Sequence, residues 1–310
     1  MTINLGARYV ALFAILATVP MAIDTRIAAA ATVYVDNAVG DDRHEGAQPS
    51  SIDGDGPVRT LRRALQVCRA GDRVLLANTG EPYRETISLS TAAHCGNALS
   101  PFIIDGQGAT LEGTEAVPRD AWENERGPVF RFRPPRTSYQ QLFLDGKPAT
   151  QRKMLAGETH FPKLQPLEWY RRGASIYFCV DSDKLPRDYD LAYSARQTGI
   201  TIYHVHDVVI TNLVVQGFRL DGVNVNDGVV DCELLDVTSR GNGRSGVTIA
   251  GSSKARLEGC VIGDNGEEQL LVEGTSSTLV EQCELIANTA PAVTNRGARL
   301  DIRTAPSEKK

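Results

Sequence analysis

The chain has 310 residues, of which 42% are hydrophobic and 23% are charged, and its formal net charge is −5. This mildly acidic balance argues against nucleic-acid binding, because contact with phosphates requires clustered Lys and Arg side chains. The length suits a single domain with an extensive core.

The N-terminal residues have the pattern of a secretory signal peptide. Arg8 supplies a positive charge, an uncharged apolar run covers residues 9–22, and Ala28 to Ala31 offer small residues for cleavage. The run is too short to span a bilayer comfortably, and no later stretch reaches about 18 apolar residues. We therefore predict that residues 1–30 are removed and that the protein is secreted, to the extracellular space, the periplasm or the cell surface, without a transmembrane segment. An uncleaved anchor is the alternative.

A strand and a helix are the first elements predicted in the mature chain. Residues 32–36 read as a short strand, and the Asp- and Gly-rich residues 37–56 read as a loop. Residues 57–70 have apolar side chains at helical spacing, with Pro57 in the first turn and Gly71 after the end. Strand-like segments follow, at residues 73–77, 86–89, 102–105 and 110–112.

From about residue 114 to residue 196 no repeat is visible. This stretch contains both tryptophans and most of the prolines, and two strand-like segments occur at residues 141–146 and 175–180. We interpret it as a long insertion, folded as a small β-subdomain and laid against the rest of the chain.

Residues 197–305 contain an internal repeat with a step of 23 or 24 residues. Gly222-Val223-Asn224-Val225 recurs as Gly246-Val247-Thr248-Ile249. Three further columns advance by the same step: Ile210, Leu234, Leu257 and Val280; Leu213, Val237, Cys260 and Cys283; and Asn242, Asn265 and Asn288. This regularity indicates a parallel β-solenoid, in which each repeat is one coil and equivalent residues stack about 4.8 Å apart. The polar tail, residues 306–310, is predicted to be disordered.

Stacking also predicts the roles of two columns. Amides stacked in a turn hydrogen-bond to one another and to the backbone, so we expect an asparagine ladder. Cys260 and Cys283 occupy an inward column, where buried free thiols pack well. Cys68 and Cys95 are candidates for an N-terminal disulfide, since export permits disulfides.

Several motifs of this chain are similar to those of one superfamily: Tyr34-Val35-Asp36-Asn37, Gly40-Asp41-Asp42, Gly56-Pro57, Gly71-Asp72, the coil Gly251 to Cys260, and the insertion motif Leu144-Asp145-Gly146-Lys147-Pro148. With these motifs the chain resembles the secreted right-handed parallel β-helix repeat proteins of the pectate-lyase-like superfamily. The resemblance implies an all-β fold, a right-handed parallel β-helix with an N-terminal helical cap and a central insertion, as one domain over residues 31–305. That superfamily includes lyases, hydrolases, epimerases and non-catalytic surface proteins, so the resemblance leaves the activity open.

No catalytic set of that superfamily can be transferred by motif. The polygalacturonase-type hydrolases carry an Asn-x-Asp, a paired Asp-Asp and a Gly-His-Gly on consecutive coils, whereas the Asp41-Asp42 pair lies in the N-terminal loop. The Trp-Ile-Asp-His and Arg-x-Pro-x-x-Arg motifs of pectate lyases are absent, and residues 131–136 do not fit the second spacing. Candidate residues must therefore come from column positions.

One charged column contains Asp207, Asp231 and Lys254 on three successive coils. Two carboxylates about 4.8 Å apart could share a calcium ion, which takes several oxygen ligands. In a lyase, that ion would neutralise a uronate carboxylate while a Lys or Arg side chain, Lys254 or Arg219, removed the proton at C5. The alternative is an exposed turn in which Lys254 offsets the charge of Asp231.

A second charged column contains Asp221 and Glu268, with Arg219 and Arg244 close by. Two coils separate these carboxylates by roughly 9–10 Å, near the upper limit of the separation found in inverting glycosidases. Arg219 or Arg244 could bind a carboxylate or sulfate group of a substrate. The alternative is a solvated charged edge.

Aromatic side chains of the insertion are further candidates. Trp169 and Tyr170 could stack on sugar rings, or they could form the small core that the insertion needs. His204 and His206 could act as acid or base, although histidines of an ordinary turn are favoured.

Two functions compete on this basis. The first is a secreted carbohydrate-active protein, a polysaccharide lyase or glycoside hydrolase, acting on a polysaccharide or cell-surface glycan between the insertion and the coils. The second is a non-catalytic surface, adhesion or carbohydrate-binding module. Charged columns that converge on one cleft beside Trp169 would favour the first, and columns that scatter around the solenoid would favour the second.

Overall fold

The computed structural model describes residues 30–52, 54–154, 157 and 160–303. The disordered tail and all but the last residue of the signal peptide, as predicted from the sequence, lie outside this part of the chain. Within the described residues, no helix is both long and apolar enough to cross a membrane.

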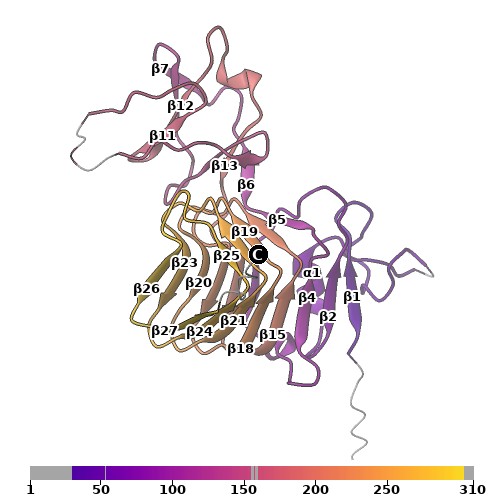
Figure 1. Ribbon diagram of the computed structural model, residues 1–310. Helices are drawn as coiled ribbons and strands as arrows, with labels where there is room; N and C mark the ends of the chain where they lie inside the picture. The colour runs from indigo at the N-terminus through magenta and orange to yellow at the C-terminus, as the bar shows by residue number, and fades with distance from the viewer. Residues whose placement is uncertain (1–29, 53, 155–156, 158–159, 304–310) are drawn as a thin grey trace, which may run out of the picture.

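The chain winds into a parallel β-helix, which confirms the predicted fold class (Figure 1). Each regular coil contributes one strand to each of three parallel sheets. The eight-stranded sheet contains β1 (Thr32–Val35), β2 (Arg73–Leu76), β4 (Phe102–Asp105), β15 (His206–Thr211), β18 (Val230–Leu235), β21 (Lys254–Glu258), β24 (Ser277–Glu281) and β27 (Arg299–Arg303). The six-stranded sheet contains β3 (Ile87–Leu89), β14 (Ile200–Tyr203), β17 (Val223–Asn226), β20 (Ser245–Ile249), β23 (Glu268–Glu273) and β26 (Val293–Arg296). The five-stranded sheet contains β5 (Thr110–Glu112), β16 (Val214–Gln216), β19 (Thr238–Arg240), β22 (Val261–Gly263) and β25 (Glu284–Leu285).

Strand register confirms the predicted columns. Val223 pairs with Val247 in the six-stranded sheet, and Leu234 pairs with Leu257, which pairs with Val280, in the eight-stranded sheet. Equivalent apolar residues therefore meet in every coil and form one continuous core along the solenoid. Removal of this apolar surface from water is the main favourable contribution to the stability of the stack.

The asparagine ladder lies in the turn that leaves the five-stranded sheet. Asn242 and Asn265 are fully buried, and the Nδ2 atom of Asn242 donates to Oδ1 of Asn265 at 3.0 Å. Asn265 Nδ2 donates in turn to Gln269 Oε1 at 2.7 Å, whereas the exposed Asn288 bonds to Asp264. The ladder thus supplies partners for polar groups that the coil buries, which would otherwise be costly.

All six cysteines are free thiols. Cys260 and Cys283 stack one coil apart as predicted, with the Cys260 amide donating to Cys283 Sγ at 3.4 Å. Cys68 is buried beneath the cap and Cys95 is half-buried, so the alternative of an N-terminal disulfide between them is not realised.

The N-terminal end of the core is covered by α1 (Leu61–Val67), which is shorter than the predicted helix of residues 57–70. Thr60 caps the helix by accepting from the Arg63 amide at 3.1 Å. Val58 is not helical because its backbone bonds to Tyr34 and Asp36, beside β1. The buried side chains of the helix close the core at this end.

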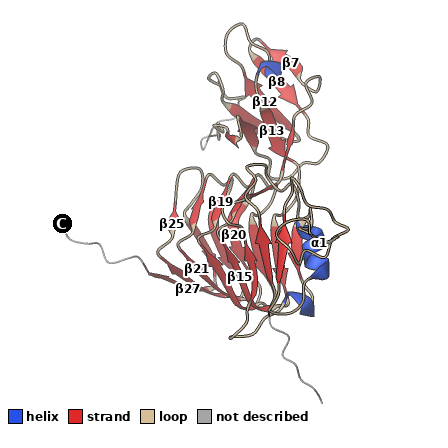
Figure 2. Cartoon of the chain, turned by 90° about the vertical axis from the view of Figure 1, so that its right-hand side faces the viewer, coloured by secondary structure: helices blue, strands red, loops and turns tan. Residues whose placement is uncertain are grey.

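The insertion forms two four-stranded antiparallel sheets. One contains β6 (Thr114–Ala116), β9 (Leu142–Leu144), β10 (Lys147–Pro148) and β13 (Leu191–Ser194). The other contains β7 (Glu123–Arg126), β8 (Val129–Phe132), β11 (Trp169–Arg172) and β12 (Ser175–Cys179). Figures 1 and 2 show that the insertion stands out from one side of the solenoid rather than lying along it, because it has a hydrophobic core of its own.

Two glycines allow the insertion to touch the coils. A Cβ atom at Gly243 would come within 1.8 Å of the carbonyl oxygen of Tyr139, and one at Gly266 would meet the Gln141 amide at 2.7 Å. Lys153 strengthens this contact by donating to the carbonyl oxygens of Gly266 and Thr289. The insertion therefore docks on the turns that lead from the five-stranded to the six-stranded sheet.

Candidate functional site

The two predicted charged columns lie at opposite ends of the six-stranded sheet. Asp221 and Glu268 lie where the chain enters this sheet, at residues 218–222, 242–246 and 265–269, which we call the insertion corner. Asp207, Asp231 and Lys254 lie beyond its other end, where the eight-stranded sheet begins, which we call the far corner. The columns therefore do not converge on one cleft, which favours the non-catalytic module over an enzyme that uses these columns.

At the far corner the column has the geometry of a charged turn. Lys254 Nζ lies 2.8 Å from Asp231 Oδ1, and both side chains are more than half exposed. Asp207 bonds instead to His206, with 2.9 Å between Oδ2 and Nδ1. Asp207 and Asp231 have φ angles of 52° and 51°, a left-handed conformation that Asp tolerates better than most residues. Their turn conformation accounts for their recurrence.

This donor set does not fit the predicted calcium site. The Asp231 carboxylate is engaged by an ammonium group, and the ammonium of Lys254 occupies the next position of the column. The residues that the structure describes contain no group of three or more His, Cys, Asp or Glu side chains arranged to hold a metal ion. Calcium takes roughly six to eight oxygen ligands, which two engaged carboxylates do not approach.

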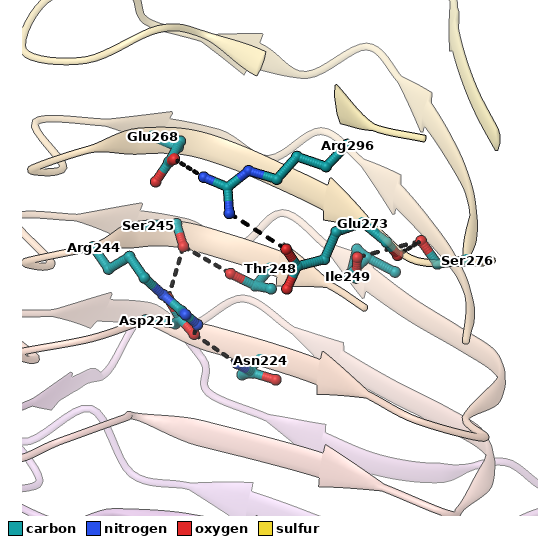
Figure 3. A network of polar contacts seen from close by, with 10 residues as sticks. All are labelled: Asp221, Asn224, Arg244, Ser245, Thr248, Ile249, Glu268, Glu273, Ser276 and Arg296. Atoms are coloured by element: carbon teal, nitrogen blue, oxygen red, sulfur yellow. Dashed lines mark hydrogen bonds and ion pairs between the residues drawn. The ribbon is translucent and has the colours of Figure 1, made fainter. Parts of the chain in front are cut away.

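At the insertion corner, Asp221 is a structural carboxylate rather than an accessible acid (Figure 3). Its side chain is fully buried and accepts from Nε of Arg244 at 2.8 Å, from Oγ of Ser245 at 2.7 Å and from Nδ2 of Asn224 at 2.6 Å. Arg244 bonds to the second oxygen as well, so the pair is bidentate. With its acceptor positions filled, Asp221 holds Arg244 in place and is not free to exchange a proton with a substrate.

Glu268 lies next to a second carboxylate that the sequence columns do not reveal. Arg296 bridges the two, with Nη2 at 2.9 Å from Glu268 Oε1 and Nη1 at 3.4 Å from Glu273 Oε2 (Figure 3). Burial raises the pKa of the Glu268 carboxyl above its usual value, against the opposing charge of Arg296. Glu268 and Glu273 are thus two carboxylates in unequal environments around one guanidinium group.

Trp169 and Tyr170 form core and do not present faces to a ligand. Trp169 is fully buried, and its Nε1 atom donates to the Ala149 carbonyl at 3.0 Å. Tyr170 is 8% exposed and lies edge-on to Phe161. The burial of both side chains favours the alternative of a core role over stacking on sugar rings, because a small subdomain must bury its large side chains to fold.

A cavity of about 500 Å³ lies at the base of the insertion, beside the insertion corner. Five of its lining side chains can carry charge or donate a proton, and we call their site the arginine pocket: Arg136, Arg196, Arg219, Glu115 and Tyr193. The insertion contributes four of them, and the solenoid contributes Arg219. Three guanidinium groups face one carboxylate, so the pocket is positively charged.

Arg219 is the most unusual side chain of the pocket. It is 8% exposed, and its guanidinium donates only to neutral oxygens, the Ala195 carbonyl at 3.0 Å and Ser138 Oγ at 3.3 Å. Within the described chain no carboxylate lies at ion-pair distance from Arg219 or Arg136. Burial and the charge of Arg136 lower the pKa of Arg219. A buried cation without a counter-ion is costly, and an anionic ligand would remove that cost.

Glu115 and Tyr193 lie side by side on the wall of the pocket. They are direct partners in the antiparallel pair of β6 and β13. Arg196 Nη1 lies 3.5 Å from Glu115 Oε1. Burial raises the pKa of the Tyr193 hydroxyl, and the charge and hydrogen bond of Glu115 raise it further.

Of the five pocket residues, the sequence columns identify only Arg219. The other four, Glu115, Arg136, Tyr193 and Arg196, belong to the non-repeating insertion, where no column identifies them. One signal was available for Arg219, which occupies the position of Gly243 and Gly266 in later coils. Arg219 thus replaces glycine in the coil where this position lines the arginine pocket, whereas Gly243 and Gly266 contact the insertion closely.

Comparisons with known proteins agree with this architecture. The family model described as a right-handed β-helix region matches residues 192–302. A solved glycoside hydrolase is similar in structure, with a TM-score of 0.58 and 12% sequence identity over 82% of this chain and 73% of that chain. The complex of XylC with xylose (TM-score 0.42, 12% identity, 88% and 70% coverage) and pectate lyase Pel9A (0.41, 11%, 81% and 52%) are less similar. A search of curated proteins gave no significant match.

Identities of this size establish the fold and leave the activity open. The match to the β-helix region covers the regular coils, and the three parallel sheets extend the same winding back to β1. The chain is therefore a right-handed parallel β-helix protein.

Proposed function

We propose that this protein is a secreted, carbohydrate-active protein that binds an acidic polysaccharide in the arginine pocket. The observation that carries the proposal is Arg219, a guanidinium group that is nine-tenths buried, has no carboxylate partner among the described residues and lines a cavity of about 500 Å³. Guanidinium groups match the planar carboxylate and the sulfate geometrically, which are the two common anionic groups of polysaccharides.

The shape of the site supports a chain-like ligand. From the pocket, charged side chains continue along the solenoid axis over successive coils, through Arg244 to Arg296 and Glu273. A polymer that lies along this row would place one anionic group in the pocket and its other sugar units beside the ion pairs of Arg244 and Arg296. The structural similarity to a glycoside hydrolase supports a carbohydrate as the polymer.

The direct test is binding of acidic and neutral polysaccharides by the purified protein, measured by calorimetry at two salt concentrations. We expect binding of acidic polymers that weakens with salt, because part of it is electrostatic. Arg219→Gln and Arg136→Gln should each weaken binding about tenfold to hundredfold, since a hydrogen bond to a charged group contributes about 1.5–3 kcal/mol.

Arg43→Gln is the matched control. The Arg43 side chain is 89% exposed in the N-terminal loop and pairs with Asp41. Its loss therefore changes the net charge equally and leaves the pocket intact. Equal binding of neutral polymers, or equal effects of Arg43→Gln and Arg219→Gln, would contradict the proposal.

A glycoside hydrolase is a second candidate, favoured by the pair Glu268 and Glu273. Glycosidases use two carboxyl groups in unequal environments, of which the one with the raised pKa acts as acid and the other as base or nucleophile; burial raises the pKa of Glu268. Release of reducing ends that Glu268→Gln and Glu273→Gln each abolish would support this candidate. Binding without any turnover would favour the non-catalytic carbohydrate-binding module.

A further inference from the structure

The arginine pocket contains more than an anion site, because strand alternation places a second pair of groups in it. Successive side chains of a strand point to opposite faces. In β6 and β13 this puts Glu115 and Tyr193 on the face toward the arginine pocket. Thr114, Ala116 and Ala192 face a different cavity of about 300 Å³.

The groups in the pocket have complementary chemistry. Arg219 and Arg136 have no carboxylate partner in the part of the chain that the structure describes, and they can bind a ligand carboxylate. Glu115 is an acceptor-only carboxylate that Arg196 holds at 3.5 Å. Tyr193 is a phenol, whose hydroxyl carries a proton that it can donate, and burial beside Glu115 raises its pKa further.

Cleavage of a uronate polymer by β-elimination needs these three functions. The proton at C5 of a uronate is weakly acidic, and neutralisation of the adjacent carboxylate makes it more so. A base must remove that proton, and an acid must protonate the oxygen that leaves C4. Electrostatic stabilisation by arginine of the charge that develops on the carboxylate is the largest contribution expected.

We propose that the arginine pocket is the catalytic site of a β-elimination on a uronate-containing polysaccharide, with Glu115 as the base and Tyr193 as the acid. This inference rests on the proposed binding of acidic polysaccharide and adds the reaction. Arg219 and Arg136 neutralise the uronate carboxylate, and Arg196 orients Glu115.

Atoms and electrons balance within the pocket. Glu115 takes the proton from C5, the C–H electron pair becomes the C4–C5 double bond, and the bond from C4 to the glycosidic oxygen breaks. Tyr193 gives its proton to that oxygen, which leaves as a free hydroxyl on the new chain end. Glu115 then returns its proton to the Tyr193 phenolate along the hydrogen bond between them, which resets both groups. No water, oxidant or metal ion is consumed.

The test uses the purified protein with polygalacturonate, alginate, hyaluronan and chondroitin sulfate, with and without a chelator. Ultraviolet absorbance of the conjugated double bond and reducing ends are followed together, and binding is measured separately by calorimetry. We expect absorbance and reducing ends to rise in equal amounts on at least one polymer, unaffected by the chelator because arginine supplies the positive charge.

Two isosteric variants assign the roles. Tyr193→Phe and Glu115→Gln should each lower kcat by about 10²–10⁴-fold while leaving the dissociation constant within about threefold. Tyr203→Phe is the matched control, since Tyr203 is 41% exposed at the far corner, and it should leave kcat unchanged. Loss of the basic limb of the pH profile in Tyr193→Phe is a signature that a purely structural role would not produce.

The outcomes separate this inference from the proposed function. Binding without elimination product on any polymer would overturn the inference and leave the binding proposal standing. Reducing ends without absorbance, or full turnover by both variants, would also overturn it, in favour of hydrolysis elsewhere on the solenoid. A pocket that binds none of the acidic polymers would overturn both.

Discussion

The carbonyl oxygen of Tyr139 lies so close to Gly243 that a single methyl group at Gly243 would come within 1.8 Å of it. This contact fixes the edge of the insertion against the solenoid, next to the residues that line the arginine pocket. Position 243 has no room for a side chain because the backbone of a different segment occupies it.

Gly243→Ala should therefore displace the insertion. A contact under 3.0 Å with backbone atoms forces a shift, and overpacking of this kind costs about 1–3 kcal/mol. We expect a lower melting temperature together with loss of polysaccharide binding. Gly263→Ala is the control, since the nearest neighbours of its Cβ would be side-chain atoms of Ile286 at 3.1 Å rather than the backbone of the insertion. Equal behaviour of the two variants would contradict the docking role of Gly243.

Asp221→Asn should destabilise the solenoid strongly. The buried carboxylate would be replaced by an amide, and Arg244 would lose its counter-ion, a loss that costs about 3–5 kcal/mol for a buried pair. Asp231→Asn should cost less than about 1 kcal/mol, because the Asp231–Lys254 pair is exposed and Asn tolerates the same φ. Urea unfolding of both variants measures the difference. A small effect at Asp221 would mean that the pair with Arg244 is not formed.

Trp169 should matter to folding of the insertion and not to ligand contact. Trp169→Ala leaves a large cavity in the insertion core and should cost about 3–5 kcal/mol, seen as early proteolysis within residues 114–196. Trp169→Phe should keep both protease resistance and polysaccharide binding. Weakened binding in Trp169→Phe, with the insertion still resistant to protease, would restore the predicted stacking role.

Glu268 should give stability a pH dependence of a defined sign. Its pKa is raised in the folded protein, so the folded state binds this proton more tightly than the unfolded state does. The resulting stabilisation is present below the ordinary glutamate pKa and is lost as the pH rises through the raised value. As the pH rises through this range, the free energy of unfolding of Glu268→Gln should therefore increase relative to that of the wild type. Unfolding curves at a series of pH values would measure the difference. A constant difference between the two proteins would show that folding leaves this pKa unchanged.

The sequence was sufficient to predict the coils because stacking is periodic. Each strand pairs with its equivalent one coil away, so residues such as Val223 and Val247 must share a chemistry, and that constraint is visible as a column. The asparagine ladder follows from the same constraint. The predicted helix over residues 57–70 is longer than α1, because Val58 pairs with Val35 of β1. This tertiary contact is not visible in the local spacing of apolar residues.

The candidate site was harder to predict because it is built where periodicity ends. Arg136, Glu115 and Tyr193 meet Arg219 only through the fold of the insertion, whose segments share no step with the coils. The columns instead pointed to Asp221, which is a structural partner of Arg244 on the next coil. A shared column therefore identifies residues that stack, and catalytic partners need not do so.

The alternation of β6 and β13 has a consequence for how this site can change. One face of the pair lines the arginine pocket and the other lines the smaller cavity. The register of each strand therefore decides which side chains point into which cavity. Deletion of a single residue before β6 would turn Glu115 away from the arginines and present Thr114 or Ala116 to them. An insertion or deletion of one residue in the loops next to β6 and β13 would thus replace the side chains that line the arginine pocket in a single step. No substitution in the coils would do so.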